Sequence, residues 1–127
     1  MVPTDLKYAQ THEWIKIDND IAIIGLTDYA ATHLGDIVYI ELPSVGTSVE
    51  MSKELTTIES VKAASDIYMP VSGEITDVNT ELEASPQLIN EDCYGKGWIV
   101  KIKVADPSEL DKLKDAAQYE EFIGGLD

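Results

Sequence analysis

The sequence has no arginine and only one cysteine, and both scarcities exclude whole classes of function. All nine basic residues are lysines, against 24 acidic residues, so the 127-residue chain has a net charge of −15. Nucleic acids and anionic membrane surfaces need a basic footprint, so we expect neither as a partner. A lone cysteine cannot form an intrachain disulfide, which suits a reducing compartment. No hydrophobic run approaches the roughly 20 residues that span a bilayer.

The remaining composition is that of one acidic, soluble, globular domain. Hydrophobic residues make up 44% of the sequence, and a chain of this length can bury a core without disulfides or metals. We therefore expect a single domain over residues 1–127. The chain starts at Met1 without a signal peptide or an arginine-rich transit segment, which favours the bacterial cytoplasm. A mitochondrial matrix protein that has lost its presequence is the alternative.

Short strands are predicted along the first three-quarters of the chain. Hydrophobic runs at Trp14–Ile17 and Ile21–Ile24 flank a turn-forming Asp-Asn-Asp segment. Thr27 is predicted to cap a short helix that ends at Gly35. The alternation from Asp36 to Leu42 predicts another strand.

Two further strands are predicted on either side of a bend at Lys62, and a last strand from Trp98 to Val104. The final quarter changes to helical spacing. Asp106 at the N-cap, followed by proline, is a strong helix start, and Asp115 is the expected start of a second helix. The pattern therefore predicts a small β-barrel or sandwich with appended helices at about 106–124.

Signatures of catalysis are scarce. The sequence has no glycine-rich phosphate loop, no nucleophile elbow and no Cys-x-x-Cys pair. His12 and His33 lie 21 residues apart, without the spacing of a metal site. Cys93 has no lysine directly beside it, which predicts an ordinary thiol rather than a nucleophile. We therefore expect a protein that is not itself an enzyme and holds no metal.

Lys62 stands out among the nine lysines. Small residues follow it, and carboxylates lie three residues before it and four residues after it, at Glu59 and Asp66. A lysine at an exposed hairpin bend is sterically open to a modifying enzyme. An ordinary surface lysine in a turn has the same local pattern, so both interpretations stay open at this point.

Blocks in order along the chain resemble the glycine cleavage system H-protein family. Glu59-Ser60-Val61-Lys62-Ala63 with Ser65-Asp66 resembles the family's lipoylation site. Other matching blocks, from about Tyr8 to about Phe122, include Thr11-His12-Glu13-Trp14, Leu34-Gly35-Asp36-Ile37-Val38, Pro70-Val71-Ser72-Gly73-Glu74-Ile75 and Gly97-Trp98. One departure is Cys93-Tyr94, where the family usually has proline before tyrosine.

The resemblance implies a lipoyl/biotinyl-type barrel-sandwich hybrid, mainly β with short helices and a helical C-terminus. It also implies lipoate in amide linkage on Lys62, which would accept the aminomethyl group from glycine decarboxylase, a pyridoxal-phosphate enzyme. The aminomethyltransferase would then receive that group, and dihydrolipoyl dehydrogenase would reoxidise the carrier. Lipoylating enzymes are further partners. A carrier whose arm must visit several enzymes is expected to be a monomer.

The resemblance suggests a pocket in which the loaded arm folds back onto the protein. Thr11, Glu13 and Asp66 match family positions suited to hold a cationic adduct, since carboxylates are natural partners of an amine. Glu13 and Asp66 could equally be solvated acids at strand edges. We assign Glu59 to recognition by the lipoylating enzymes.

Four alternatives remain open. The chain could be another lipoyl or biotinyl domain, although biotin carriers have methionines where Val61 and Ala63 stand. It could serve mainly as a lipoyl donor to other proteins. It could also be an acidic interaction module in which Lys62 is never modified and Trp14 and Trp98 form a ligand face. An independent hydrolase is the weakest alternative, because no nucleophile–base pair can be assembled.

Overall fold

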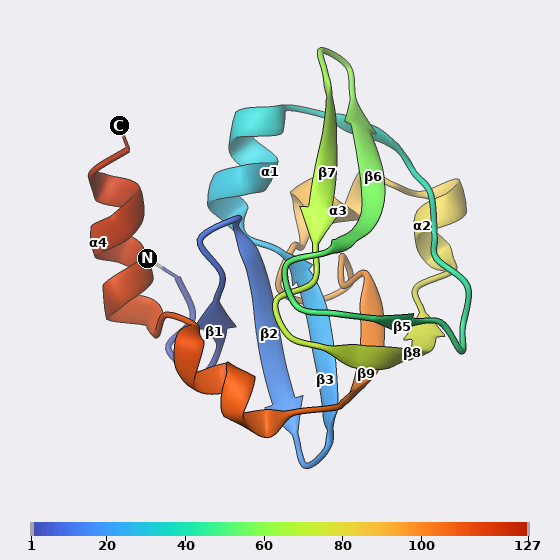
Figure 1. The fold of residues 1–127 in the computed structure, drawn as a ribbon. Coiled ribbons are helices and arrows are strands. Elements are labelled where there is room, and N and C mark those ends of the chain that lie inside the picture. The colour runs from blue at the N-terminus through green and yellow to red at the C-terminus, as the bar shows by residue number, and fades with distance from the viewer. Residues whose placement is uncertain (1, 127) are drawn as a thin grey trace.

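The computed structural model describes residues 2–126, which form two antiparallel sheets with short helices around them (Figure 1). The strands are β1 (Lys7–Tyr8), β2 (Glu13–Asp18), β3 (Ile21–Leu26), β4 (Ile37–Ile40), β5 (Ser48–Val49), β6 (Glu54–Ser60), β7 (Ala64–Tyr68), β8 (Gly73–Val78) and β9 (Val100–Val104). The helices are α1 (Asp28–Leu34), α2 (Glu81–Ala84), α3 (Leu88–Glu91), the 3-10 helix η1 (Pro107–Lys112) and α4 (Ala116–Gly124). The predicted fold class is confirmed.

The larger sheet has the strand order β1-β2-β3-β9-β8-β5, and the smaller has the order β4-β6-β7. Pairing of β3 with β9, from Ile21 opposite Lys103 to Ile24 opposite Val100, joins the first and last quarters of the chain. The main core gathers buried side chains from both sheets, such as Ile24, Ile58 and Ile102. The sheets therefore form a sandwich from which the β6–β7 hairpin projects (Figure 1).

Helix α1 begins and ends where the sequence predicts. The Thr27 side chain accepts a hydrogen bond from the Ala30 N–H, and Gly35 ends the helix at a φ of 83°. The Asn90 side chain ties this end of the helix to its neighbours. Its amide donates to the Gly35 carbonyl at 2.9 Å, and its oxygen accepts from the Ile37 N–H at 2.8 Å. These bonds hold the chain beneath the tip of the β6–β7 hairpin.

The predicted strand from Asp36 to Leu42 is shorter than expected, and its alternation is wrong. Strand β4 spans only Ile37–Ile40, and its register against β6 shifts between Ile37 and Tyr39. A bulge turns two consecutive side chains to the same side. Val38 and Tyr39 are consequently both exposed, while Ile37 and Ile40 are buried.

The C-terminal region is helical, as predicted, but its first piece is the 3-10 helix η1. Asp106 caps η1, and Asp115 forms a capping box with Gln118 at the start of α4. The chain is extended between the two helices, and Ala116 at the start of α4 is buried whereas Ala117 is exposed. No helix among residues 2–126 is long and apolar enough to cross a membrane.

Helix α4 covers a second, smaller cluster against the edge of the larger sheet. Tyr119 stacks on Tyr8 with ring centres 4.7 Å apart, and Trp14 is buried in the same cluster. The Trp14 indole N–H donates to the Cys93 carbonyl at 2.9 Å.

Trp98 is only half-buried and precedes β9, contrary to the predicted strand boundary. Since the Trp14 side chain is buried, the two tryptophans do not form an exposed ligand face.

Candidate functional site

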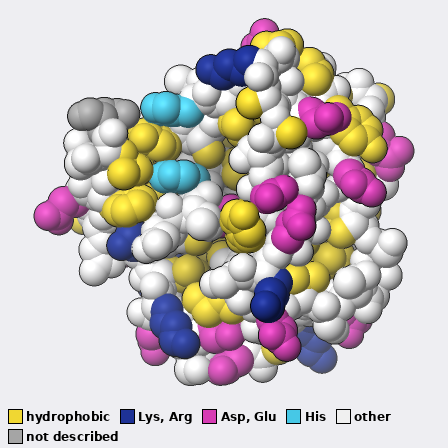
Figure 2. Space-filling view, turned by 45° about the horizontal axis from the view of Figure 1, so that its top comes forward, with side chains coloured by type: hydrophobic (Ala, Val, Ile, Leu, Met, Phe, Trp, Pro, Cys, Tyr) yellow, Lys and Arg dark blue, Asp and Glu magenta, His cyan; other side chains and the backbone are white. Residues whose placement is uncertain are grey.

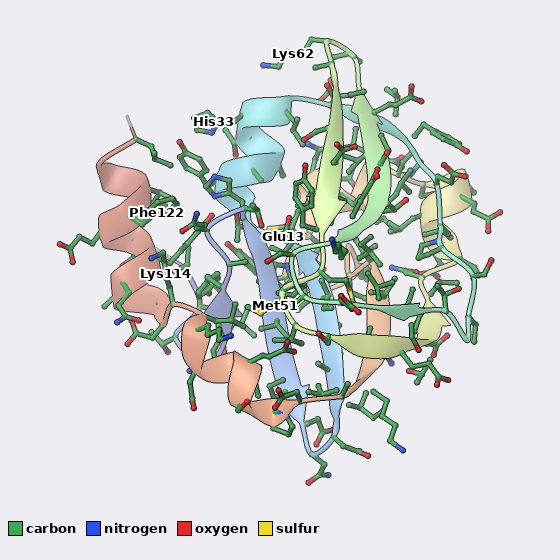
Figure 3. All side chains as sticks on the ribbon, in the orientation of Figure 1. Glu13, His33, Met51, Lys62, Lys114 and Phe122 are labelled. Carbon is green, nitrogen blue, oxygen red and sulfur yellow. The ribbon has the colours of Figure 1, made fainter. Side chains whose placement is uncertain are left out.

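Lys62 lies at the tip of the β6–β7 hairpin and is exposed (Figure 3). The Ser60 N–H donates to the Ala63 carbonyl at 2.8 Å, which closes the turn. The Val61 N–H donates to the Asp36 carbonyl at 2.9 Å, which ties the tip to the segment after α1. The predicted bend at Lys62 is confirmed, and its backbone is held on both sides.

The buried side chain of Ser60 organises this tip, a role that the sequence motif alone did not reveal. Its Oγ accepts hydrogen bonds from the Lys62 N–H at 3.3 Å and the Ala63 N–H at 3.1 Å. Its hydroxyl lies 3.1 Å from the Ala63 carbonyl, to which it donates. The turn therefore needs nothing from the Lys62 ammonium, which can be modified without disturbing the backbone.

Replacing Ser60 with alanine should loosen the tip. Ser60→Ala leaves the Lys62 and Ala63 N–H groups without their protein acceptor, and we expect a loss of about 1 kcal/mol in unfolding free energy. The rate at which Lys62 is modified should fall as well. Urea denaturation and a modification time course measure the two effects. Ser65→Ala on the same hairpin is the control, and equal effects of both variants would contradict this role of Ser60.

The stem of Lys62 lies over the end of α1. Gly35 has a φ of +83°, and a Cβ at this position would lie 3.5 Å from the Lys62 Cε. A glycine suits this place because its backbone conformation is strained for other residues. Lys62 is thereby placed above the helix that forms one wall of the adjacent cavity.

A cavity of about 210 Å³ lies between α1, β7 and the loop that follows β1. We call it the arm cavity. Figure 2 shows this face, on which both histidine side chains lie beside hydrophobic ones. The lining residues are Thr11, His12, Leu26, Tyr29, Ala30, His33, Leu34, Ile58, Ser65, Asp66 and Ile67. The structure thus brings Thr11 and Asp66, far apart in the sequence, to one cavity.

Glu13 does not line the arm cavity but lies buried next to Thr11. The Glu13 side chain is fully inaccessible to solvent. One carboxylate oxygen accepts a short hydrogen bond from the Thr11 hydroxyl, and the other accepts from the Tyr68 N–H at 3.2 Å. The alternative of a solvated acid is therefore wrong for Glu13, whereas Asp66 is exposed. Thr11 stands between the Glu13 carboxylate and the cavity.

Burial raises the pKa of Glu13 to about 7, and the hydrogen bonds from Thr11 and Tyr68 offset only part of that shift. Desolvation disfavours the charged form of a carboxyl group that has no cation beside it. Near neutral pH the Glu13 carboxyl group is therefore poised between its two protonation states. A cation that reached it would favour the carboxylate and displace the proton.

The stability of the protein should reflect this raised pKa. The ordinary pKa of Glu13 is 4.5. Between about pH 4.5 and 7 the folded state therefore binds a proton that the unfolded state has released, so this group stabilises the fold less as the pH rises. Across that window wild type should lose about 3 kcal/mol more than Glu13→Gln. Urea denaturation at several pH values measures the difference, and parallel curves would contradict it.

A hydrogen-bonded chain that the sequence did not indicate links the arm cavity to α4. The buried Thr27 hydroxyl lies 2.7 Å from the Tyr119 hydroxyl, which lies 2.8 Å from the His12 Nδ1. Either hydroxyl of the Thr27–Tyr119 pair can donate to the other, and the Thr27 oxygen also accepts from the Ala30 N–H at 3.3 Å. Burial and His33 lower the pKa of His12. The lowered pKa favours the neutral imidazole of His12 at pH 7.

Two remaining predicted residues lie apart from the arm cavity. Glu59 is exposed on β6, where it pairs with Ala64 of β7, and it lies three residues before Lys62. Cys93 is buried, and this burial, with Asp28 and Asp92 nearby, raises the pKa of its thiol to about 11. A thiol with so high a pKa is a poor nucleophile at neutral pH.

Comparison with known proteins shows which family shares this arrangement. The sequence pattern of the family described as glycine cleavage H-protein matches residues 6–125. The chain belongs to the glycine cleavage H-protein family. A glycine cleavage system H protein from Parvibaculum lavamentivorans is 51% identical over 97% of this chain and 98% of its own. One from Carboxydothermus hydrogenoformans is 53% identical over 97% and 95%.

Other H proteins extend the comparison. A mitochondrial H protein from Arabidopsis thaliana is 52% identical over 96% of this chain and 78% of its own. The crystal structure of the Mycobacterium marinum H protein is similar with a TM-score of 0.87 and 33% identity, over 97% of this chain and 99% of the other. H proteins are lipoyl carriers of the glycine cleavage system and not catalysts. The alternatives of a biotinyl domain and of a hydrolase are therefore wrong.

Proposed function

We propose that this H protein carries a lipoyl group in amide linkage on Lys62 and shuttles an aminomethyl group between enzymes. The observation that supports the proposal most is the exposed Lys62 at the tip of a hairpin whose backbone is fixed by Ser60. The described residues fit the group. Lys62 and Ala63 are exposed, so a modifying enzyme can reach the amine. The arm cavity, with hydrophobic side chains in its wall, adjoins the same hairpin.

A lipoyl group on Lys62 would supply a dithiolane whose S–S bond breaks as one sulfur takes up the aminomethyl group from glycine decarboxylase, leaving the other sulfur as a thiol; after transfer at the aminomethyltransferase, dihydrolipoyl dehydrogenase would oxidise the remaining dithiol back to the dithiolane. The protein contributes the tether. Its rigid hairpin fixes one end of the arm, and the single bonds of the lysyl and acyl chains give a reach on the order of a dozen Å. Tethering raises the local concentration of the reactive end at each partner site.

The residues of the arm cavity protect the arm between visits. Asp66 is an exposed carboxylate of the cavity wall, and Glu13 lies directly behind Thr11. A cationic amine docked here can bind Asp66 at once. It can reach Glu13 after the Thr11 hydroxyl turns aside, and it then holds the Glu13 carboxyl group in its charged form.

Further proposals concern the partners and the setting of the protein. Glu59, exposed on β6 three residues before Lys62, is available to the lipoylating enzymes. We propose that the chain acts as a monomer, so that the arm is free to visit each enzyme. Its relatives include bacterial proteins and a mitochondrial plant protein, which fits either the bacterial cytoplasm or the mitochondrial matrix.

Reconstitution with purified glycine decarboxylase tests the proposed function. The lipoylated chain, glycine and the decarboxylase should give new free thiol on the chain in proportion to the carbon dioxide released. Adding aminomethyltransferase and tetrahydrofolate should then remove the aminomethyl group. The matched control is the same chain from cells that cannot lipoylate, which should show neither reaction. A lipoylated chain that fails to support carbon dioxide release would overturn the proposal.

A further inference from the structure

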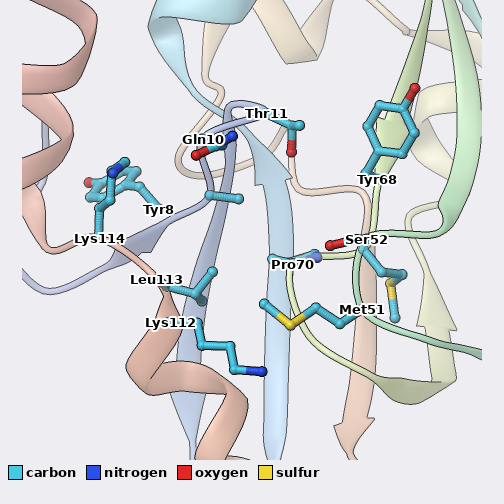
Figure 4. Close-up of a pocket in the computed structure, with 12 residues that line it drawn as sticks. Tyr8, Gln10, Thr11, Met51, Ser52, Tyr68, Pro70, Lys112, Leu113 and Lys114 are labelled. Carbon is cyan, nitrogen blue, oxygen red and sulfur yellow. The ribbon is translucent and has the colours of Figure 1, made fainter.

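A second, larger pocket of about 510 Å³ adjoins the arm cavity, and Thr11 lines both. It is bordered by the loop after β1, the segment before β6, the end of β7 and the connection between η1 and α4 (Figure 4). We call it the lysine pocket because Lys112 and Lys114 line it.

The charge of this pocket is opposite to that of the rest of the protein. Two of the nine lysines of the chain line it, and none of the described residues in its lining is acidic, although the chain holds 24 acidic residues. Lys112 is exposed. The Lys114 Nζ lies 5.0 Å from the centre of the Phe122 ring. That contact holds the ammonium in place but leaves it N–H donors for an anion.

The pocket also offers apolar surface beside its lysines. Met51 and Leu113 are half-buried and line it, and Figure 4 draws them with Lys112 around the same opening. Methionine is an adaptable residue that suits contact with another molecule. An occupant that complements this pocket therefore combines carboxylates with at least one apolar side chain.

The lysine pocket is directly connected to Glu13. The two groups that donate hydrogen bonds to the Glu13 carboxylate are the Thr11 hydroxyl and the Tyr68 N–H, and both residues line this pocket. A molecule bound here touches the residues that hold Glu13 next to the arm cavity. The enzyme that takes the aminomethyl group must draw the loaded arm out of the arm cavity. Contact with Thr11 and Tyr68 therefore serves that enzyme in particular.

We propose that the lysine pocket is the docking site for an acidic segment, with an apolar anchor, of the enzyme that takes the aminomethyl group from the arm. This inference rests on the proposed function. Complementary charge accelerates encounter and fixes orientation. Because the chain as a whole is strongly acidic, a pocket whose described lining carries two lysines and no acidic residue favours one orientation of that partner. A second copy of this chain, with a net charge of −15, is repelled by the overall field.

Charge reversal in the pocket tests the proposal. The affinity of the lipoylated chain for purified aminomethyltransferase is measured at low and at moderate salt for wild type and three variants. Lys112→Glu with Lys114→Glu should weaken binding by about tenfold and reduce its salt dependence. Lys16→Glu with Lys96→Glu makes the same change in net charge away from the pocket, and its effect should stay below about twofold. Met51→Glu places an acid in the pocket without touching a lysine and should also weaken binding.

Each outcome decides the matter. Equal weakening by both double variants would overturn the proposal, because the effect would then come from net charge alone. Unchanged binding of the pocket variants would overturn it as well, and so would an effect seen only in self-association during sedimentation. Loading by glycine decarboxylase is measured on the same samples. If the chain is loaded normally but its binding to aminomethyltransferase does not depend on the pocket residues, only this inference is contradicted. If the wild-type chain is not loaded at all, the proposed function is contradicted.

Discussion

Lys62→Arg is expected to abolish glycine cleavage in a reconstituted system, with no turnover above that of a sample lacking this protein. Arginine keeps the positive charge and the exposure of residue 62, but its guanidinium cannot take the place of the lysine amine in the lipoyl amide. The loss should occur without unfolding, because no side-chain contact of Lys62 supports the turn, and the unfolding free energy should change by less than about 0.5 kcal/mol. Carbon dioxide release from labelled glycine and urea denaturation give the two results.

The matched control for this variant is Lys53→Arg. Lys53 is also an exposed lysine, but it lies just before β6 and outside the hairpin tip. It should retain full turnover. Measurable turnover by Lys62→Arg, or an equal loss in Lys53→Arg, would show that the carrier group sits elsewhere.

Loss of the cavity carboxylates should shorten the life of the loaded arm. Glu13→Gln and Asp66→Asn each remove one negative charge close to a docked amine while keeping the size of the side chain. A hydrogen bond to a buried charged group contributes about 1.5–3 kcal/mol, so Glu13→Gln should speed loss of the aminomethyl group by about tenfold or more. Asp66 is exposed, and an exposed ion pair contributes about 1 kcal/mol or less, so Asp66→Asn should speed the loss by about fivefold at most. Release of formaldehyde or ammonia from the isolated loaded protein measures the rate.

The pH dependence separates the two carboxyl groups. The pKa of Glu13 is about 7 before an amine docks. The protection that Glu13 gives the aminomethyl group should therefore strengthen as the pH rises through 7, because more of its carboxyl group is charged. That dependence should be absent in Glu13→Gln and retained in Asp66→Asn. Thr57→Ala, which removes a hydroxyl 3.3 Å from the Asp66 carboxylate but does not line the cavity, is the control. Decay rates that match wild type in both carboxylate variants would contradict the assignment of these residues.

Local signals predicted the elements that depend on local chemistry. Thr27 and Gly35 bound α1 as expected, since caps depend on residues adjacent in sequence. The bend at Lys62 and the helix start at Asp115 are correct for the same reason. The bulge in β4 was missed because it depends on register with β6, which alternation in one strand cannot reveal.

The candidate site was only partly predictable. The carboxylates were expected from the family resemblance, but the complete burial of Glu13 follows from packing of the loop after β1 against β7. Ser60 belongs to the motif around Lys62, yet its three hydrogen bonds depend on the geometry of the turn. His12 is connected to Tyr119 across 107 residues, and no signal in one sequence reports such a contact.

Lipoylation at Lys62 is tested most simply by the mass of the intact protein from cells supplied with lipoate, followed by mass spectrometry of its peptides. We expect a single lipoyl-sized increment that maps to Lys62, the residue at the hairpin tip. Glu59→Ala should lower the fraction that carries it, with Glu54→Ala at the other end of β6 as the control. No increment on this chain, in cells that lipoylate another protein, would contradict the carrier role and leave Lys62 an ordinary turn lysine.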